Sequence, residues 1–343
     1  MHPVMKEDRT RNLAILIVAA LVIALPAAVG EFYLYVVRII FVYAILVIGM
    51  NIFMGYCGQI NLGIAGFFCI GAYVPAILET KLGWHYFLTF PIGVIIALAV
   101  AWLVSWPLLR LRSHSMAIGT LAFGEAIYLL FERFKSITGG TDGMVVPPLV
   151  LFGHEMGYVF YYYFIFAFLI AALIAEYRLV NKRVGRALKA VRDDENAAEA
   201  MGVDVEHYRR MSWLLNAGLA AVGGALYVQQ AGFISPDIFS IMASLQILVM
   251  FCVGGASTIL GPVVGSAIMI CLPYVLIAVQ HYMYLVQGLI LFGILRFLPS
   301  GIVGTILDSW PTPHGDETVV TGPYHRLATD QVATSGEERN GRE

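Results

Sequence analysis

The chain has 343 residues, of which 59% are hydrophobic and 13% charged, and its formal net charge at pH 7 is -2. Its mean hydropathy of +0.78 excludes an ordinary soluble domain. About ten apolar runs lie between residues 13 and 298, each near the roughly 20 residues that a helix needs to cross the hydrocarbon core. The sequence therefore predicts an all-α fold, a polytopic transmembrane helical bundle of about ten spans.

The first apolar run, residues 13–30, follows a basic start and has the features of a signal peptide or of a span. Because the site after Pro26 is a poor match for cleavage, we expect a span. Residues 1–12 then form an N-terminal arm, and residues 13–298 form the transmembrane domain. The remaining spans are expected at residues 32–54, 60–79, 86–109, 114–132, 158–176, 211–232, 239–257, 262–279 and 281–298.

The positions of Lys and Arg predict the orientation, because short loops rich in these residues stay cytoplasmic. With the N-terminus inside and ten spans, 17 of the 21 Lys and Arg residues lie in cytoplasmic segments. Residues 308–343 are polar and without periodicity, which predicts a disordered tail. We therefore expect both the arm and the tail in the cytoplasm. The four basic residues that disagree are Arg38, Lys81, Arg133 and Lys135.

A glycine-rich run, "GYCGQINLGIAGFFCIGAY", covers residues 55–73. Glycine weakens a helix, and membrane proteins tolerate broken helices where they line a cavity or pack closely on a neighbour. Close packing of small residues is the simpler interpretation of any single glycine. The polar side chains in the same run favour a translocation path, with four candidate residues: Gly58, Gln59, Asn61 and Gly63.

A second glycine-interrupted segment, "VGGASTILGPVVGSA", covers Val253–Ala267 and contains a small-xxx-small pair at Gly261 and Gly265. Interruptions in the two halves of a transporter often mark its pathway. The identity between the two halves of the chain is too low to indicate a duplication.

Arg38 and Glu125 lie well inside predicted spans, where charges are costly and usually paired or functional. Glu125 and Arg38 are expected about 12 and 9 Å below the outer ends of their spans, at 1.5 Å per residue. Because the depths are similar, we expect a structural ion pair, or a carboxylate at Glu125 that lines the path.

The most charged stretch of the chain lies at residues 178–210, which hold 14 of its 44 charged residues. We expect two short helices joined by a bend. Leu188 and Val191 share one face of the first helix. Asp193 or Asp194 is expected to cap the second helix.

The second short helix is expected to end at Gly202 in the left-handed conformation. Ala197, Ala198 and Met201 would give it a small apolar patch, suited to a groove on another protein. A merely solvated loop explains the basic residues but not their alternation with Asp and Glu.

Signatures of covalent chemistry are missing from the sequence. There is no Walker A motif and no G-x-S-x-G, and "HEMGY" at His154 lacks the second histidine of a zinc site. We therefore expect no enzyme, no metal and no cofactor in this chain. The four cysteines are interpreted as small hydrophobic residues: Cys57, Cys69, Cys252 and Cys271.

The stretch "GRALKAVRDDENAAEAMGV" resembles the coupling loop of ABC transporter permeases of the branched-chain amino acid type. "GYCGQINLGIAGFFCIGAY", "TLAFGE" and "TGGTDGM" resemble the same family in the same order, and more narrowly its M-type subunit. The resemblance implies that residues 177–210 dock into an ATPase. It assigns this role to Gly185, Arg186, Ala197, Ala198, Glu199 and Gly202.

The same resemblance implies the partners of the chain. These are a related H-type permease, two cytoplasmic ATPases that bind ATP and Mg²⁺, and a periplasmic or lipid-anchored binding protein. The assembly would sit in the cell (inner or plasma) membrane among lipids, and no nucleic acid partner is expected. ATPase closure would tilt the spans and exchange inward- and outward-facing states.

Two alternatives stay open from the sequence. Asn61 and Ile64 differ from the residues that relatives commonly carry in the glycine-rich run, so urea, amides or another small solute compete with branched-chain amino acids. A secondary transporter driven by an ion gradient would use Glu125 as its ion ligand, but it leaves the charged stretch unexplained.

Overall fold

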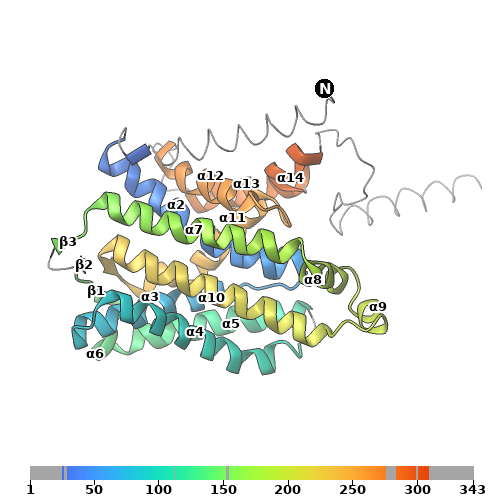
Figure 1. Ribbon diagram of the computed structural model, residues 1–343, viewed down its shortest axis with the longest axis horizontal. Coiled ribbons are helices and arrows are strands. Elements are labelled where there is room, and N and C mark those ends of the chain that lie inside the picture. Colours follow the sequence, from blue (N-terminus) through green and yellow to red (C-terminus); the bar gives the residue numbers. More distant parts are fainter. Residues whose placement is uncertain are drawn as a thin grey trace, which may run out of the picture.

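A computed structural model describes residues 25–26, 29–111, 113–151, 154–275, 283–298 and 300–308. Long helices lie side by side along one direction, with the short strands at one end and α8 (Arg183–Asp193) and α9 (Glu195–Ala200) at the other (Figure 1). The expected N-terminal arm, nearly all of the first span and the tail beyond Asp308 lie outside the described residues. The all-α fold is confirmed.

Six described helices are long and apolar enough to cross a membrane. Each of the nine predicted spans after residue 30 coincides with a described helix, but α11, α12 and α13 have only 14, 15 and 15 residues. The long helices are α2 (Glu31–Met50) with its π-helical extension η1 (Asn51–Tyr56), α3 (Ile64–Leu82), α4 (Tyr86–Leu108), α5 (Ser113–Arg133), α7 (Tyr158–Val180) and α10 (Val205–Ala231). The shorter apolar helices are α11 (Ile241–Gly254), α12 (Gly261–Val275) and α13 (Met283–Phe297).

The remaining elements are short and lie at the two ends of the bundle. Strand β1 pairs antiparallel with β4, and β2 pairs antiparallel with β3. The strands are β1 (Met144–Val145), β2 (Val150–Leu151), β3 (His154–Glu155) and β4 (Phe233–Ile234). The short helices besides α8 and α9 are α6 (Lys135–Thr138), η2 (Gly140–Asp142), η3 (Pro236–Phe239) and α14 (Gly301–Asp308).

Helix α2 is the central element of the bundle. Every residue from Arg38 to Met50 is buried, and α7, α10 and α12 pack around the helix. A helix that is apolar on all sides belongs inside a protein core or within a membrane. The composition of α2 is therefore consistent with its central position.

Helices α3 and α10 cross at backbone contact. A Cβ atom added to Gly71 would lie 2.2 Å from the carbonyl oxygen of Ala221, and one added to Gly224 would lie 2.2 Å from that of Phe68. Small residues allow such approaches, on which helix association in membranes depends. These glycines therefore position α3 against the core.

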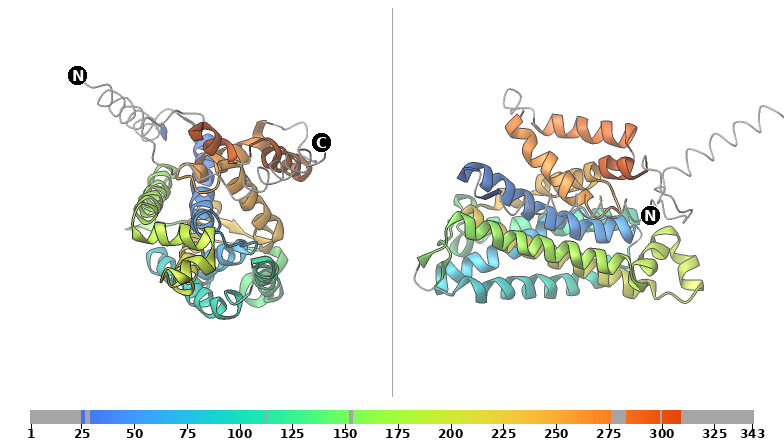
Figure 2. Two further views of the ribbon diagram at one scale, coloured as in Figure 1. Left: turned by 90° about the vertical axis from the view of Figure 1, so that its right-hand side faces the viewer. Right: turned by 45° about the horizontal axis from the view of Figure 1, so that its top comes forward.

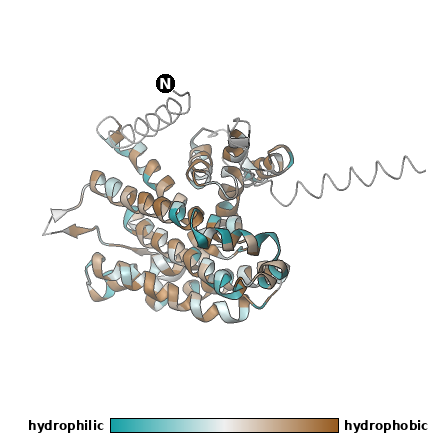
Figure 3. Ribbon diagram, turned by 45° about the vertical axis from the view of Figure 1, so that its right-hand side comes forward, coloured by the Kyte–Doolittle hydropathy of each residue, from teal (hydrophilic) through white to brown (hydrophobic). Residues whose placement is uncertain are grey.

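Large apolar side chains cover the outward faces of α4 and α5. Ile95, Leu103 and Ile118 are 62%, 68% and 70% exposed. Figure 3 shows that the long helices are mainly hydrophobic, whereas hydrophilic residues gather toward the end that carries α8 and α9. Exposed apolar area of this extent suits contact with lipid or with another membrane subunit.

We expect Gly71→Ala to lower the free energy of unfolding by about 1–3 kcal/mol, because the added methyl group overlaps the α10 backbone. Gly288→Ala is the control, since a Cβ atom there meets nothing within 4 Å. Thermal unfolding of the purified protein measures both variants. Equal unfolding temperatures for the two would contradict the close α3–α10 packing.

Candidate functional site

Helices α8 and α9 lie across the ends of the long helices, as the left view of Figure 2 shows. Leu188 and Val191 are 0% and 1% exposed, and they face Tyr56, Cys57 and Val180 in a small apolar cluster. The predicted shared face of α8 is therefore confirmed. Through this face, α8 is fixed to the ends of α7 and η1.

The ends of α9 are formed by the predicted residues. Asp194 accepts hydrogen bonds from the backbone N–H groups of Asn196 and Ala197, at 2.8 and 3.0 Å. Gly202 has φ +84°, and the next N–H, of Val203, donates to the carbonyl of Ala198 at 3.0 Å. The second helix therefore begins at an Asp cap and ends at a left-handed glycine, and the predicted bend is confirmed.

The predicted apolar patch on α9 is wrong at Ala198. This residue is 4% exposed and belongs to the apolar cluster, whereas Met201 is 85% exposed. A six-residue helix has one face toward the protein, and Ala197 and Ala198, being adjacent, lie about 100° apart around it. Only Ala197 of the alanine pair lies on the exposed side.

The predicted ATPase-coupling residues divide into two sets. Gly185 and Ala198 are buried and pack inward. A Cβ atom on Gly185 would lie 1.9 Å from the carbonyl oxygen of Val180, so this glycine packs directly on the backbone at the end of α7. The residues on the exposed surface are Arg186, Ala197, Glu199 and Gly202.

A groove of about 320 Å³ lies beside α9. Its walls come from the end of α4, from α9 and from the start of α10. Charged residues of both signs line it, including Arg110, Glu195, Glu199, Glu206 and Arg209.

Helix η1 ends at Tyr56 and α3 begins at Ile64, so residues 57–63 form a break in the predicted glycine-rich run. Gly58 has φ +73°, and a Cβ atom there would lie 2.6 Å from Cγ of Arg192. A side chain at this position would meet both backbone strain and α8. The predicted helix interruption is therefore confirmed.

A second break separates α11 from α12, between Gly254 and Gly261. Gly255 has φ +110°, and Ser257, with φ 61°, is the one residue other than glycine with positive φ among those described. A Cβ atom on Gly265 would lie 2.0 Å from the carbonyl oxygen of Met250, so this glycine packs α12 on α11.

The two breaks meet at Arg192 of α8. Its Nη1 donates to the carbonyl of Gly55 at 3.2 Å and to Oγ of Ser257 at 3.0 Å. Ser257 Oγ itself donates to the Gly55 carbonyl at 2.8 Å. One nitrogen of the Arg192 guanidinium group thus joins the last turn of η1, directly before the first break, to the second break.

Asn51, the first residue of η1, extends this network. Its Oδ1 accepts from the N–H of Ser257 at 2.8 Å, and its Nδ2 donates to Glu176 Oε1 at 2.7 Å and to the carbonyl of Thr258 at 2.9 Å. We call Asn51, Gly55, Glu176, Arg192 and Ser257 the polar connector. It joins α8, η1, α7 and the second break.

The predicted path residues lie in and beside the first break. Gln59 is 3% exposed, and its Nε2 donates to Glu195 Oε1 of α9 at 2.8 Å. Asn61 is fully buried, and its Oδ1 accepts from the N–H of Gly63 at 2.9 Å. A Cβ atom on Gly63 would lie 1.8 Å from the carbonyl oxygen of Thr120, so close packing on α5 explains this glycine.

The predicted ion pair between Arg38 and Glu125 is wrong. Arg38 donates through Nε to the carbonyl of Leu34 at 3.3 Å and through Nη1 to that of Tyr158 at 3.2 Å. Glu125 Oε2 is buried without a hydrogen-bond partner among the described residues. Similar depths in the membrane do not determine which face of a helix each side chain occupies. Arg38 bonds to Tyr158 of α7, whereas α5, which carries Glu125, packs on α3.

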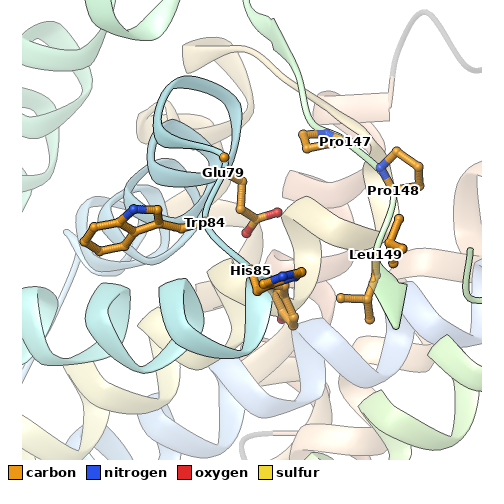
Figure 4. A pocket seen from close by; sticks show the side chains of 9 residues that line it. Glu79, Trp84, His85, Pro147, Pro148 and Leu149 are labelled. Atoms are coloured by element: carbon orange, nitrogen blue, oxygen red, sulfur yellow. The ribbon is translucent and has the colours of Figure 1, made fainter. Parts of the chain in front are cut away.

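A cavity of about 270 Å³ opens at the opposite end of the bundle. It lies between the end of α3, the start of α4 and the segment that leads into β2. Figure 4 shows the Glu79 carboxylate between His85 on one side and the Pro147–Leu149 segment on the other. This carboxylate is not among the site residues predicted from the sequence.

Cys57 and Cys69 are buried free thiols. Burial raises the pKa of Cys57, which lies in the first break, to about 11, so its thiol stays protonated and inert at neutral pH. Within the described ranges, no group of three or more His, Cys, Asp or Glu side chains is placed to hold a metal ion.

We expect Asn51→Leu to loosen both breaks, because it leaves the Ser257 N–H and the Glu176 carboxyl group unpaired. Each buried group without a partner costs about 1–3 kcal/mol. Hydrogen exchange should therefore become faster in residues 51–58 and 255–260. Asn181→Leu, at an exposed amide, is the control; unchanged exchange in both variants would contradict the connector.

Comparison with known proteins identifies the family. The model of the family "Branched-chain amino acid transport system / permease component" matches residues 32–295. The chain is 26% identical over 324 residues to the high-affinity branched-chain amino acid transport system permease protein LivM of Escherichia coli K12, covering 87% of this chain and 76% of the relative. It is 24% identical over 285 residues to LivH of the same strain, covering 76% and 91%.

A relative named for another solute is also similar. The chain is 26% identical over 219 residues to the autoinducer 2 import system permease protein LsrC of Salmonella paratyphi B, covering 61% of this chain and 60% of that one. No solved structure matches the chain. Since the family match covers most of the chain, the protein belongs to the family of permease components of branched-chain amino acid transport systems.

Proposed function

We propose that the protein is the M-type permease subunit of an ATP-driven importer of branched-chain amino acids. It would pair with an H-type permease, receive solute from a periplasmic or lipid-anchored binding protein, and be driven by two ATPase subunits that hold ATP and Mg²⁺. It would cross the cell (inner or plasma) membrane several times, with both termini in the cytoplasm. Two attachments carry the proposal. Arg192 holds α8 to η1 and to the second break, and the hydrogen bond from Gln59 to Glu195 holds α9 to the first break.

The mechanism follows from these attachments. An ATPase that presses on the exposed residues of α8 and α9 would displace both helices together, since the apolar cluster and the Asp194 cap hold them as one unit. Arg192 would pass the displacement to η1 and to the second break, and Gln59 would pass it to the start of α3. Transport then becomes a rigid-body exchange between two packings of the bundle.

The similarity to LivM supports the choice of solute. It extends over 87% of the chain, whereas the similarity to LsrC covers 61%. Because relatives in this family are named for different solutes, a non-amino-acid solute, such as urea or an amide, is the second candidate. An ion-coupled secondary transporter remains the rival of another class, and its ion ligand would be Glu125.

We expect leucine uptake by the assembled complex in proteoliposomes to require ATP on the ATPase side and to persist when the ion gradient is collapsed. Competition among leucine, isoleucine, valine, urea and amides then identifies the solute. Uptake by the isolated chain without ATP, or uptake abolished by an ionophore with ATP present, would contradict the proposal.

Arg192→Ala should lower ATP-driven uptake by about tenfold while the partner ATPases continue to hydrolyse ATP, because the link to both breaks is lost. Arg192→Lys keeps the charge but not the planar fork, so we expect an intermediate loss. Arg133→Ala, at an exposed arginine on α5 away from α8 and α9, is the control. Equal ratios of uptake to hydrolysis in all variants would refute the role of Arg192.

A further inference from the structure

The cavity at the end of the bundle opposite α8 and α9 combines a buried carboxylate with apolar walls (Figure 4). Glu79 of α3 is 7% exposed. The walls include Trp84, Pro147, Pro148 and Leu149. The cavity volume of about 270 Å³ lies near the lower end of the range for small-molecule sites.

The hydrogen-bond partners of Glu79 are neutral. Thr89 Oγ1 donates to its Oε1 at 2.8 Å, and Gln229 Nε2 donates to its Oε2. None of the ion pairs found in the described part of the chain includes Glu79. Lys81, two residues further along α3, donates to the carbonyl of Ser136 instead.

The site has more acceptors than donors. Each carboxylate oxygen can accept two hydrogen bonds and here accepts one from a described residue, so Glu79 retains free acceptor positions. Gln229 is also 7% exposed, and its Oε1 is buried without a partner among the described residues. Since Gln229 Nε2 bonds to Glu79, the unpartnered amide oxygen on the same carbon is close to the carboxylate.

A buried carboxylate without a cation is costly, and a positively charged donor removes the cost. An ammonium group offers three N–H donors and one positive charge. The apolar walls beside it fit an aliphatic side chain, and the exposed imidazole of His85 offers an N–H donor for an acidic group.

We propose that this cavity is a binding site for a small aliphatic primary amine, whose ammonium group is received by Glu79. The identity of that amine rests on the proposed function: it would be a branched-chain amino acid. The site would receive it at the end of the bundle opposite the ATPase-coupling helices. Glu79 would then favour solutes that carry an amino group over neutral ones of the same shape.

The experiment uses the assembled transporter in lipid nanodiscs without the binding protein. Saturation-transfer NMR measures the binding of three probes that share a 3-methylbutyl group: leucine, isopentylamine and 4-methylpentanoate. Leucine and isopentylamine should bind saturably. The affinity for 4-methylpentanoate should be lower by about tenfold or more, because this probe lacks the ammonium group.

Glu79→Gln should weaken isopentylamine binding by about tenfold, since it removes the charge and keeps the size. Thr89→Val removes a neutral donor and keeps the carboxylate, so it should preserve most of the binding even if it lowers stability. Glu31→Gln, at an exposed carboxylate on the same end, is the matched control.

Wild-type affinity in Glu79→Gln, or equal binding of isopentylamine and 4-methylpentanoate, would overturn the proposal. Thermal unfolding confirms that each variant is folded before binding is measured. The two proposals fail separately. If isopentylamine binds through Glu79 but leucine uptake is not driven by ATP, the proposed transport function is rejected and the amine site stands. If leucine is taken up but Glu79→Gln binds amines as the wild type does, this site is rejected and the transport function stands.

Discussion

The structure depends on one constraint, which is that backbone polar groups released by a broken helix must find partners where lipid offers none. Two breaks in the bundle release such groups near the α8–α9 end. At one of them, Ser257 holds a positive φ of 61°, a strained conformation that persists only where the surroundings fix it. Arg192, Asn51 and Ser257 supply the partners for both breaks.

The hydrogen bonds that pair these polar groups also connect distant elements mechanically. Segments that are more than 200 residues apart along the chain, η1 and the turn before α12, share hydrogen bonds with one another and with Arg192 of α8. Displacement of α8 alone would break both of these Arg192 hydrogen bonds and take the partly buried guanidinium away from its acceptors, at a cost that favours movement of the connected elements together. The exposed side of α8 and α9 is thereby coupled to the interior of the bundle. The cavity beside Glu79 lies at the other end, where Val150 of β2 is among its lining residues.

Local features were predictable from the sequence, and contacts between distant elements were not. Apolar runs located the helices, and Asp194 and Gly202 located the ends of α9, because each depends on nearby residues. The predicted Arg38–Glu125 ion pair is wrong because the depth of a residue in its span does not determine which neighbouring helix its side chain faces. Ala198 was assigned to a surface that it does not occupy. The contact of Asn51 with Ser257 has no local signal, although Asn51 and Glu176 were polar residues within apolar runs.

The most direct test is a pair of distances measured by electron spin resonance in the assembled transporter, with the native cysteines replaced. One pair of labels, at Met201 and Leu260, reports on α9 and the second break; both positions are exposed. A second pair, at Met201 and Leu82, spans the bundle. We predict that trapping nucleotide on the ATPases leaves the first distance unchanged and shifts the second. A shift in the first distance with the second unchanged would show that α9 moves independently of the breaks and would contradict the account.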